Sequence, residues 1–186
     1  GYWGVGRDIT AEKRAELARA ATEARYSELF ARSPSPLMLH RDAIVIDANT
    51  AALALFDVSD TATLIGRSLL DFYDEADGSR QLATERAQAL RELPVGEAMP
   101  PHQFVMRTAR GRRVVAQVTS VKVDTGGGPA ILSIYQDETE RLRAEVARLR
   151  SEALMTHLVA TSPDLITLTD VATGRYVMVN DAFERV

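Results

Sequence analysis

Few side chains in this sequence could carry out chemistry, and they are scattered. The three histidines, His40, His102 and His157, do not have the spacing of metal ligands. Cysteine is absent, which excludes disulfides, thiolate catalysis and cysteine-ligated metals. His40 belongs to an apolar, strand-like segment, where a strand or surface position is favoured over one that faces a cavity. The histidines therefore predict neither a catalytic nor a metal centre.

Two other clusters also fail to indicate a reaction. Asp74, Glu75 and Asp77 form an acidic group that is typical of a solvated loop rather than a cation site. The glycines at 126–128 are not followed by a helix with Lys and Ser/Thr, so they do not form a phosphate-binding loop. No motif links a serine nucleophile to His and Asp. We expect no enzyme activity from this part of its parent protein.

The strongest pattern in the chain is a repeat. Asp137-Glu138-Thr139 precedes a charged helical segment, and Asp8-Ile9-Thr10 precedes a similar segment 129 residues earlier. Ser33-Pro34 and Ser162-Pro163, each in front of an apolar strand pattern, have the same 129-residue separation. Two unrelated landmarks with one offset indicate a tandem array of domains.

The segments that must position these residues predict an α+β fold. A five-stranded antiparallel sheet with short helices on one face is expected, and Asn49 is expected to cap a short helix after the first strand pair. The expected elements are strands at 37–40 and 43–46, joined by a turn at Arg41-Asp42, an amphipathic helix at 78–92, and strands at 103–107, 113–121 and 130–135.

Two long segments rich in Ala, Glu, Arg and Leu are expected to form helices that link domains. In the second helix, Leu142, Val146 and Leu149 have coiled-coil spacing, which predicts a seam and a parallel homodimer. The expected organisation is a domain tail at 1–9, a helical linker at 10–32, a complete domain at 33–137, a helical coiled-coil linker at 138–161 and the start of a following domain at 162–186.

The order of motifs in the complete copy resembles that of the PAS sensor family. The matching motifs, in chain order, are Leu29-Phe30, Ser33-Pro34, Asn49 with Ala52, Phe56 with Val58-Ser59, Leu64 to Leu69, Asp77, Phe104, Arg107 with Gly111, and Asp137-Glu138-Thr139. The resemblance implies a PAS fold whose sheet and helices can enclose a small ligand. It also implies a sensory or dimerisation module in a cytoplasmic, bacterial-type signalling protein.

The resemblance further implies a signalling joint at the end of the domain. There, Asp137 pairs with a basic residue near the strand turn, for which Arg107 and Arg112 are both candidates, and Asp137 or Thr139 caps the outgoing helix. Output domains in similar proteins are histidine kinases or diguanylate cyclases and phosphodiesterases. The residues of this chain leave the choice between these outputs open.

The ligand also stays open at the level of sequence. Without cysteine, the covalent flavin chemistry of light-sensing relatives is excluded, and helix 78–92 lacks the histidine of haem-binding relatives. No cofactor is expected, although a non-covalent flavin is compatible with the sequence. A PAS-like spacer that binds nothing and a module that associates with another sensor are the alternatives.

The charge balance bears on partners and location. The net charge of −4 and pI of about 5.4 argue against nucleic acid or a membrane surface as a partner. No apolar run reaches the roughly 20 residues of a membrane span. A cytoplasmic location is expected, and a membrane anchor elsewhere in the parent protein remains compatible with it.

Overall fold

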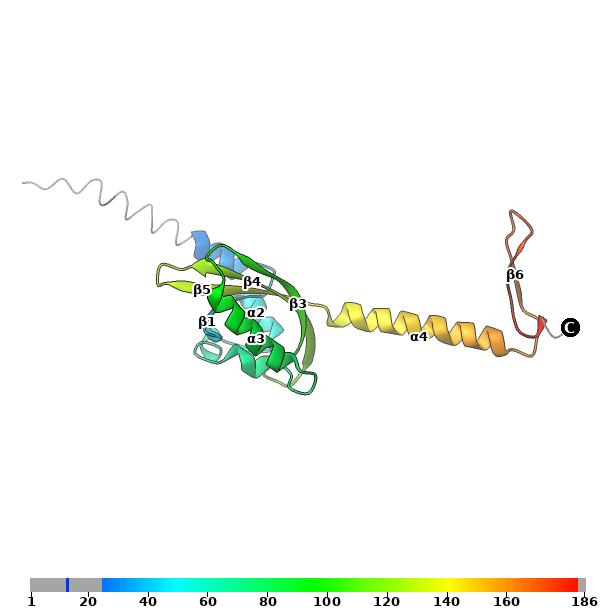
Figure 1. Ribbon diagram of the computed structural model, residues 1–186, viewed down its shortest axis with the longest axis horizontal. Coiled ribbons are helices and arrows are strands. Elements are labelled where there is room, and N and C mark those ends of the chain that lie inside the picture. The colour runs from blue at the N-terminus through cyan, green and yellow to red at the C-terminus, as the bar shows by residue number, and fades with distance from the viewer. Residues whose placement is uncertain (1–12, 14–24, 184–186) are drawn as a thin grey trace, which may run out of the picture. The chain divides into compact units, whose positions relative to one another are not determined.

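Figure 1 shows a computed structural model of the chain, which describes Lys13 and residues 25–183. The chain divides into two compact units, and the division falls between Glu138 and Thr139. The expected domain tail at 1–9 and most of the expected helix at 10–32 lie outside the described residues. Residues 25–32 are helical.

The first unit is a sheet with short helices. Its elements, in chain order, are β1 (Leu37–Arg41), β2 (Ile44–Ala48), α2 (Thr50–Leu55), the 3-10 turns η1 (Thr61–Thr63) and η2 (Leu69–Phe72), α3 (Ser79–Glu92), β3 (Ala98–Arg107), β4 (Arg113–Asp124) and β5 (Pro129–Asp137). Helices α2 and α3 lie over one face of the sheet (Figure 1).

The sheet is antiparallel throughout, with the strand order β2-β1-β5-β4-β3. The last strand, β5, lies between β1 and β4, where Leu132 pairs with Leu39 and Tyr135 pairs with Val118. This arrangement brings the first hairpin and the last three strands into one sheet. The predicted α+β fold, with its five-stranded antiparallel sheet and short helices, is confirmed.

Two expected boundaries were wrong. The first hairpin turns at Asp42-Ala43 instead of Arg41-Asp42, and both turn residues have positive φ, 50° and 63°, as a tight two-residue hairpin turn requires. Strand β3 begins at Ala98, five residues before the expected start, although it contains Pro100 and Pro101. Because β3 is an edge strand, prolines without an N–H group can be accommodated there.

The core fills the space between the sheet and the helices. Phe56 packs against Phe72 and Tyr135, with ring centroids 4.9 Å and 5.3 Å apart. From α3, Ala83 is buried in the same cluster. Burying aromatic side chains of this size dominates the hydrophobic contribution to stability.

The second unit contains one long helix and a strand pair. Its elements are α4 (Thr139–Thr161), β6 (Thr167–Thr169) and β7 (Tyr176–Val179), and β6 and β7 pair antiparallel. Among the described residues, no helix has both the length and the hydrophobicity that crossing a membrane requires.

Candidate functional site

The end of strand β5 is held by an arginine from the neighbouring hairpin. The guanidinium group of Arg112 lies 3.8 Å from the carboxylate of Asp137. Its Nε lies 3.1 Å from the Asp57 carboxylate, and a terminal nitrogen donates to the carbonyl oxygen of Leu55 at 2.9 Å. The hydrogen bond from Arg112 lowers the pKa of Asp57. Arg112 therefore ties the end of α2 and the β3–β4 turn to the last residue of β5.

The other candidate arginine has a different partner. Arg107 forms its ion pair with Asp74, at 3.0 Å, and Arg113 also approaches that carboxylate, at 3.9 Å. The expectation of a solvated acidic loop was wrong for Asp74, because this side chain is buried and accepts a hydrogen bond from the backbone N–H of Ala76. Its two cationic neighbours compensate for the cost of burying the charge.

A single residue joins the sheet to the long helix. Strand β5 ends at Asp137 and α4 begins at Thr139, the two residues that were the alternative candidates for capping this helix. The N–H of Glu138 donates to the carbonyl oxygen of Val115 at 2.8 Å, which continues the β4–β5 hydrogen bonding to the end of the strand. No loop therefore separates β5 from α4.

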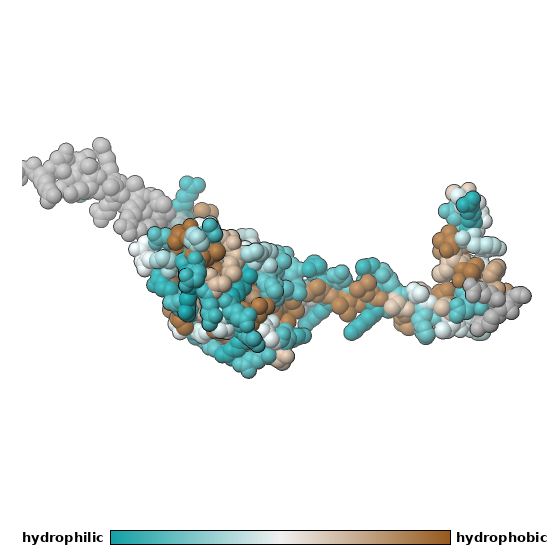
Figure 2. All heavy atoms as spheres, in the orientation of Figure 1, coloured by the Kyte–Doolittle hydropathy of each residue, from teal (hydrophilic) through white to brown (hydrophobic). Residues whose placement is uncertain are grey.

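The predicted seam residues lie on α4. Leu142 is half-buried, whereas Val146 and Leu149 expose 46% and 51% of their surface. Figure 2 shows apolar side chains exposed along this helix. Such a row of half-exposed apolar residues is typical of a helix that packs against a partner helix.

Inside the first unit, His40 begins a row of polar side chains across the sheet. Its Nε2 lies 3.0 Å from the hydroxyl of Ser133 on β5, which lies 3.1 Å from the hydroxyl of Ser120 on β4. Burial lowers the pKa of His40 to about 4 against the opposing effect of Asp42, so the ring is neutral near pH 7. His40 is on a strand, but the expectation that it would not face a cavity was wrong.

That cavity lies between α3 and the sheet and has a volume of about 30 Å³, with room for one or two water molecules. Two residues that line the cavity have a buried polar atom without a hydrogen-bond partner among the described residues, His40 Nδ1 and Arg86 Nε. Burial raises the pKa of Tyr73, which lines the cavity, to about 12. Unpaired buried polar groups are rare and indicate that water or a ligand completes this site.

The sequence interpretation missed the two serines. Ser120 and Ser133 occupy inward-facing positions on strands that otherwise place apolar side chains there. Each serine stands at a position where the alternation of the strand predicts an apolar residue, and this departure could have identified both residues from the sequence. Pairing between β4 and β5 was needed to see that the two residues are opposite each other.

Asn49 and Asn180 make closely matching sets of hydrogen bonds, one in each unit. The Asn49 amide oxygen accepts from the N–H of Leu37, and that of Asn180 accepts from the N–H of Ile166, both at 2.9 Å. Each amide nitrogen donates to three carbonyl oxygens, those of Phe30, Ser33 and Ser35 in the first unit and those of Val159, Ser162 and Asp164 in the second. Each of these backbone groups that contact Asn49 lies 129 residues before the corresponding group that contacts Asn180.

Comparison with known proteins finds a family model that matches part of the chain. A family model described as "PAS domain" matches residues 24–91. A search of curated proteins found no match.

Solved structures share the fold. The PAS domain of an HTR-like protein from Haloarcula marismortui has 20% identity and a TM-score of 0.53, covering 67% of this chain and 98% of that one. A PAS domain from Colwellia psychrerythraea has 13% identity and a TM-score of 0.52, covering 64% and 98%. An RNA-binding light-oxygen-voltage receptor has 16% identity and a TM-score of 0.55, covering 71% of this chain and 38% of that receptor.

Proposed function

We propose that this chain, whose residues 24–91 match a PAS domain model, is a sensory and dimerisation module of a bacterial signal-transduction protein. The module passes a signal through its linker helices to an output domain, either a histidine kinase or a cyclic-di-GMP enzyme. The contribution of this chain is conformational rather than catalytic.

The observation that carries this proposal is the Arg112 contact. One side chain joins the segment after α2, the β3–β4 turn and the end of β5, and only Glu138 separates β5 from α4. A change in the packing of α2 therefore alters the support of Asp137. Packed elements of this kind have a few discrete arrangements. In this proposal, a change in the packing of α2 therefore becomes a small rotation or shift of α4.

The exposed seam supports the dimer. Val146 and Leu149 lie one turn apart and leave apolar surface in water, and a second copy of α4 would cover it. In a parallel pair of helices, a rotation of α4 where it leaves the domain would also rotate its far end.

The matching asparagine contacts support a tandem organisation. In this proposal, residues 33–137 form a complete domain and residues 162–186 begin a following one, with 138–161 as the linker. Asn180 supports this because its contacts reproduce those by which Asn49 fixes the entry into β1.

Insertions in α4 test the proposal in a protein that carries this chain with its output domain. One residue inserted after Val146 turns the downstream helix by about 100°, while seven residues nearly restore its phase. We expect the single insertion to abolish regulation of output and the seven-residue insertion to retain it. Equal regulation in both variants would contradict transmission through the helix.

A spacer that binds no ligand is the second candidate, and the small volume of the inner cavity favours it. Mass spectrometry of small molecules released from the purified, denatured chain separates the two functions. A stoichiometric organic molecule supports the sensor, and its absence after reconstitution trials supports the spacer.

A further inference from the structure

We propose that a groove at one end of the sheet, outside the small inner cavity, binds a small organic anion with a hydrocarbon body, such as a medium-chain carboxylate. This proposal rests on the sensory function proposed above and gives it a ligand class. The groove has a volume of about 480 Å³, within the range of small-molecule sites.

Three segments that are distant in sequence form the groove. They are the end of β1 with the β1–β2 turn, the last turns of α3, and the loop between β4 and β5. Arg41 holds that loop in place, because its guanidinium group donates to the carbonyl oxygens of Pro129, at 3.0 Å, and Gly127, at 3.1 Å. Binding here would therefore act on the hairpin that ends in β5.

The wall of the groove is apolar. Ala43 from the β1–β2 turn, Ile131 from β5, and Ala87 and Leu90 from α3 line it, and all except the half-buried Ala87 are buried. A hydrocarbon chain placed against these side chains would remove apolar surface from water on both sides.

One residue that lines the groove has an unpaired polar atom. His40 lines both the groove and the inner cavity, is 4% exposed, and has no partner for Nδ1 among the described residues. Its other nitrogen contacts Ser133 on β5. A polar group of a bound molecule, or a water beside it, would complete the hydrogen bonding of the ring and contact the row of polar side chains that leads to β5.

The rim is cationic. Arg41, Arg91 and Lys122 line the groove, and the one carboxylate in its described lining, that of Asp42, pairs with Arg91 at 2.9 Å. Two positive charges therefore remain uncompensated within the described lining, on a chain whose net charge is −4. Lys122 donates to the main-chain carbonyl of Arg91 at 2.6 Å and so keeps its charge beside the opening. An apolar wall below a cationic rim fits an amphiphilic anion.

Calorimetric titration of the 186-residue chain tests the ligand class with three probes: octanoate, 1-octanol and acetate. Octanoate has both features, octanol has only the chain, and acetate has only the charge. We expect octanoate to bind at least about tenfold more tightly than either of the others, because each of them lacks one set of contacts. Equal affinity for octanoate and octanol, or no octanoate binding, would overturn the proposal.

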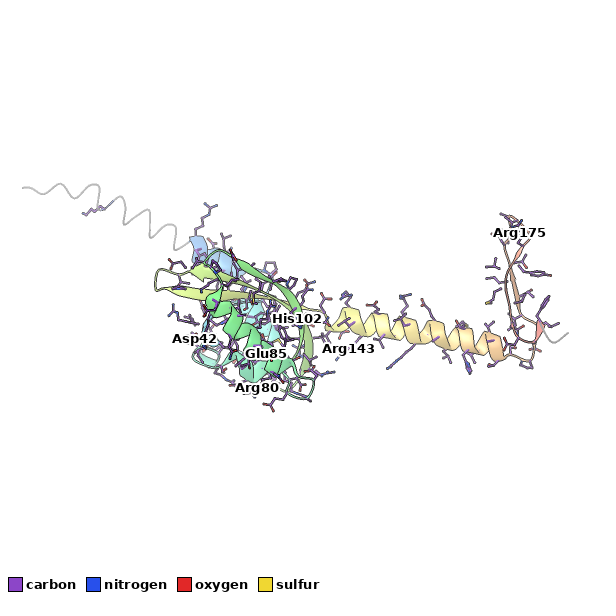
Figure 3. All side chains as sticks on the ribbon, in the orientation of Figure 1. Asp42, Arg80, Glu85, His102, Arg143 and Arg175 are labelled. Carbon is purple, nitrogen blue, oxygen red and sulfur yellow. The ribbon has the colours of Figure 1, made fainter. Side chains whose placement is uncertain are left out.

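Substitutions locate the site. Ala87→Phe fills the groove and should abolish octanoate binding, and Lys122→Gln should weaken it about three- to tenfold. Arg80→Gln is the matched control, because Arg80 is a cation in the first turn of α3 and does not line the groove. Asp42 instead pairs with Arg91 in the last turn of α3, and Figure 3 labels Arg80 and Asp42. Equal effects of Lys122→Gln and Arg80→Gln would overturn the site.

The circular dichroism spectrum checks the folding of each variant. If Ala87→Phe does not fold, the surface substitution Lys122→Gln decides alone. Loss of octanoate binding together with intact phase dependence of the α4 insertions would remove the ligand assignment and leave the signalling function standing.

Discussion

At the scale of single residues, burial gives ordinary side chains specific roles. His40 is a neutral strand residue whose Nε2 contacts Ser133, because the core strongly disfavours the charged ring. Asp74 stays buried beside Arg107, and Asp57 is hydrogen-bonded by Arg112. Each of these contacts joins side chains from different strands or loops, so each reports on how the elements are packed.

His40 should make the stability of the chain depend on pH. Its pKa is about 4 in the folded chain and near 6.5 when unfolded, so the unfolded chain binds more protons between these values. The contribution of neutral His40 to the free energy of unfolding is therefore fully present above about pH 6.5. It decreases by on the order of 3 kcal/mol as the pH drops towards 4. Thermal unfolding of the wild type and of His40→Gln from pH 7.5 to 4.5 measures this, with a wild-type curve that falls more steeply. Parallel curves would exclude the effect.

At the scale of elements, α4 combines a polar surface with one apolar row. The seam residues Leu142, Val146 and Leu149 lie on one side, whereas Leu154 and Leu158, also exposed, follow nearer the end of the helix and face another direction. Arg141–Glu145 and Arg148–Glu152 pairs, at 3.6 Å and 2.5 Å, add the small stabilisation of exposed i, i+4 pairs. Packing against a partner helix, rather than these ion pairs, should determine where α4 associates.

Val146→Glu should therefore weaken self-association strongly. A buried, unpaired carboxylate in the dimer seam costs several kcal/mol, so the dissociation constant should rise by at least about a hundredfold. Ser151→Glu places the same charge on the opposite side of α4 and is the matched control. Sedimentation velocity over a range of concentrations measures both variants. If the wild-type chain is monomeric, or if the two variants associate equally, the seam is not the dimer contact.

At the scale of the whole molecule, each of the two units has an asparagine whose side-chain amide makes a closely matching set of backbone hydrogen bonds. Asn49 fixes the entry into β1, and Asn180 makes matching contacts at the entry into β6. The two-residue difference between the 131-residue separation of the asparagines and the 129-residue repeat is explained by the longer second hairpin. The same local solution at the same spacing supports two copies of one domain plan.

We expect the two units to unfold locally and independently of each other. Asn49→Ala removes several buried hydrogen bonds, at about 1 kcal/mol each, and should speed amide exchange at Leu37 while exchange at Ile166 is unchanged. Asn180→Ala should do the opposite, so each variant controls for the other. Amide exchange measured by NMR reads both positions. Coupled changes at Leu37 and Ile166 would show that the units do not open independently.

The sequence by itself determined the α+β class, the order of the elements from β1 to β5 and the capping role of Asn49. These features depend on local periodicity and on turn and cap residues, which can be read along the chain. It also left Arg107 and Arg112 as equal candidates for Asp137, and it placed His40 away from a cavity and Asp74 in solvent.

Only the tertiary structure decided these points. Strand β5 lies between β1 and β4, which brings Ser133 to His40 and Asp137 to Arg112 from segments far apart in the chain. Arg107 lies on the edge strand β3, where it meets Asp74. Because side-chain pairing depends on which strands are neighbours, and because strand order is set by packing rather than by local propensity, the candidate site emerged only with the fold.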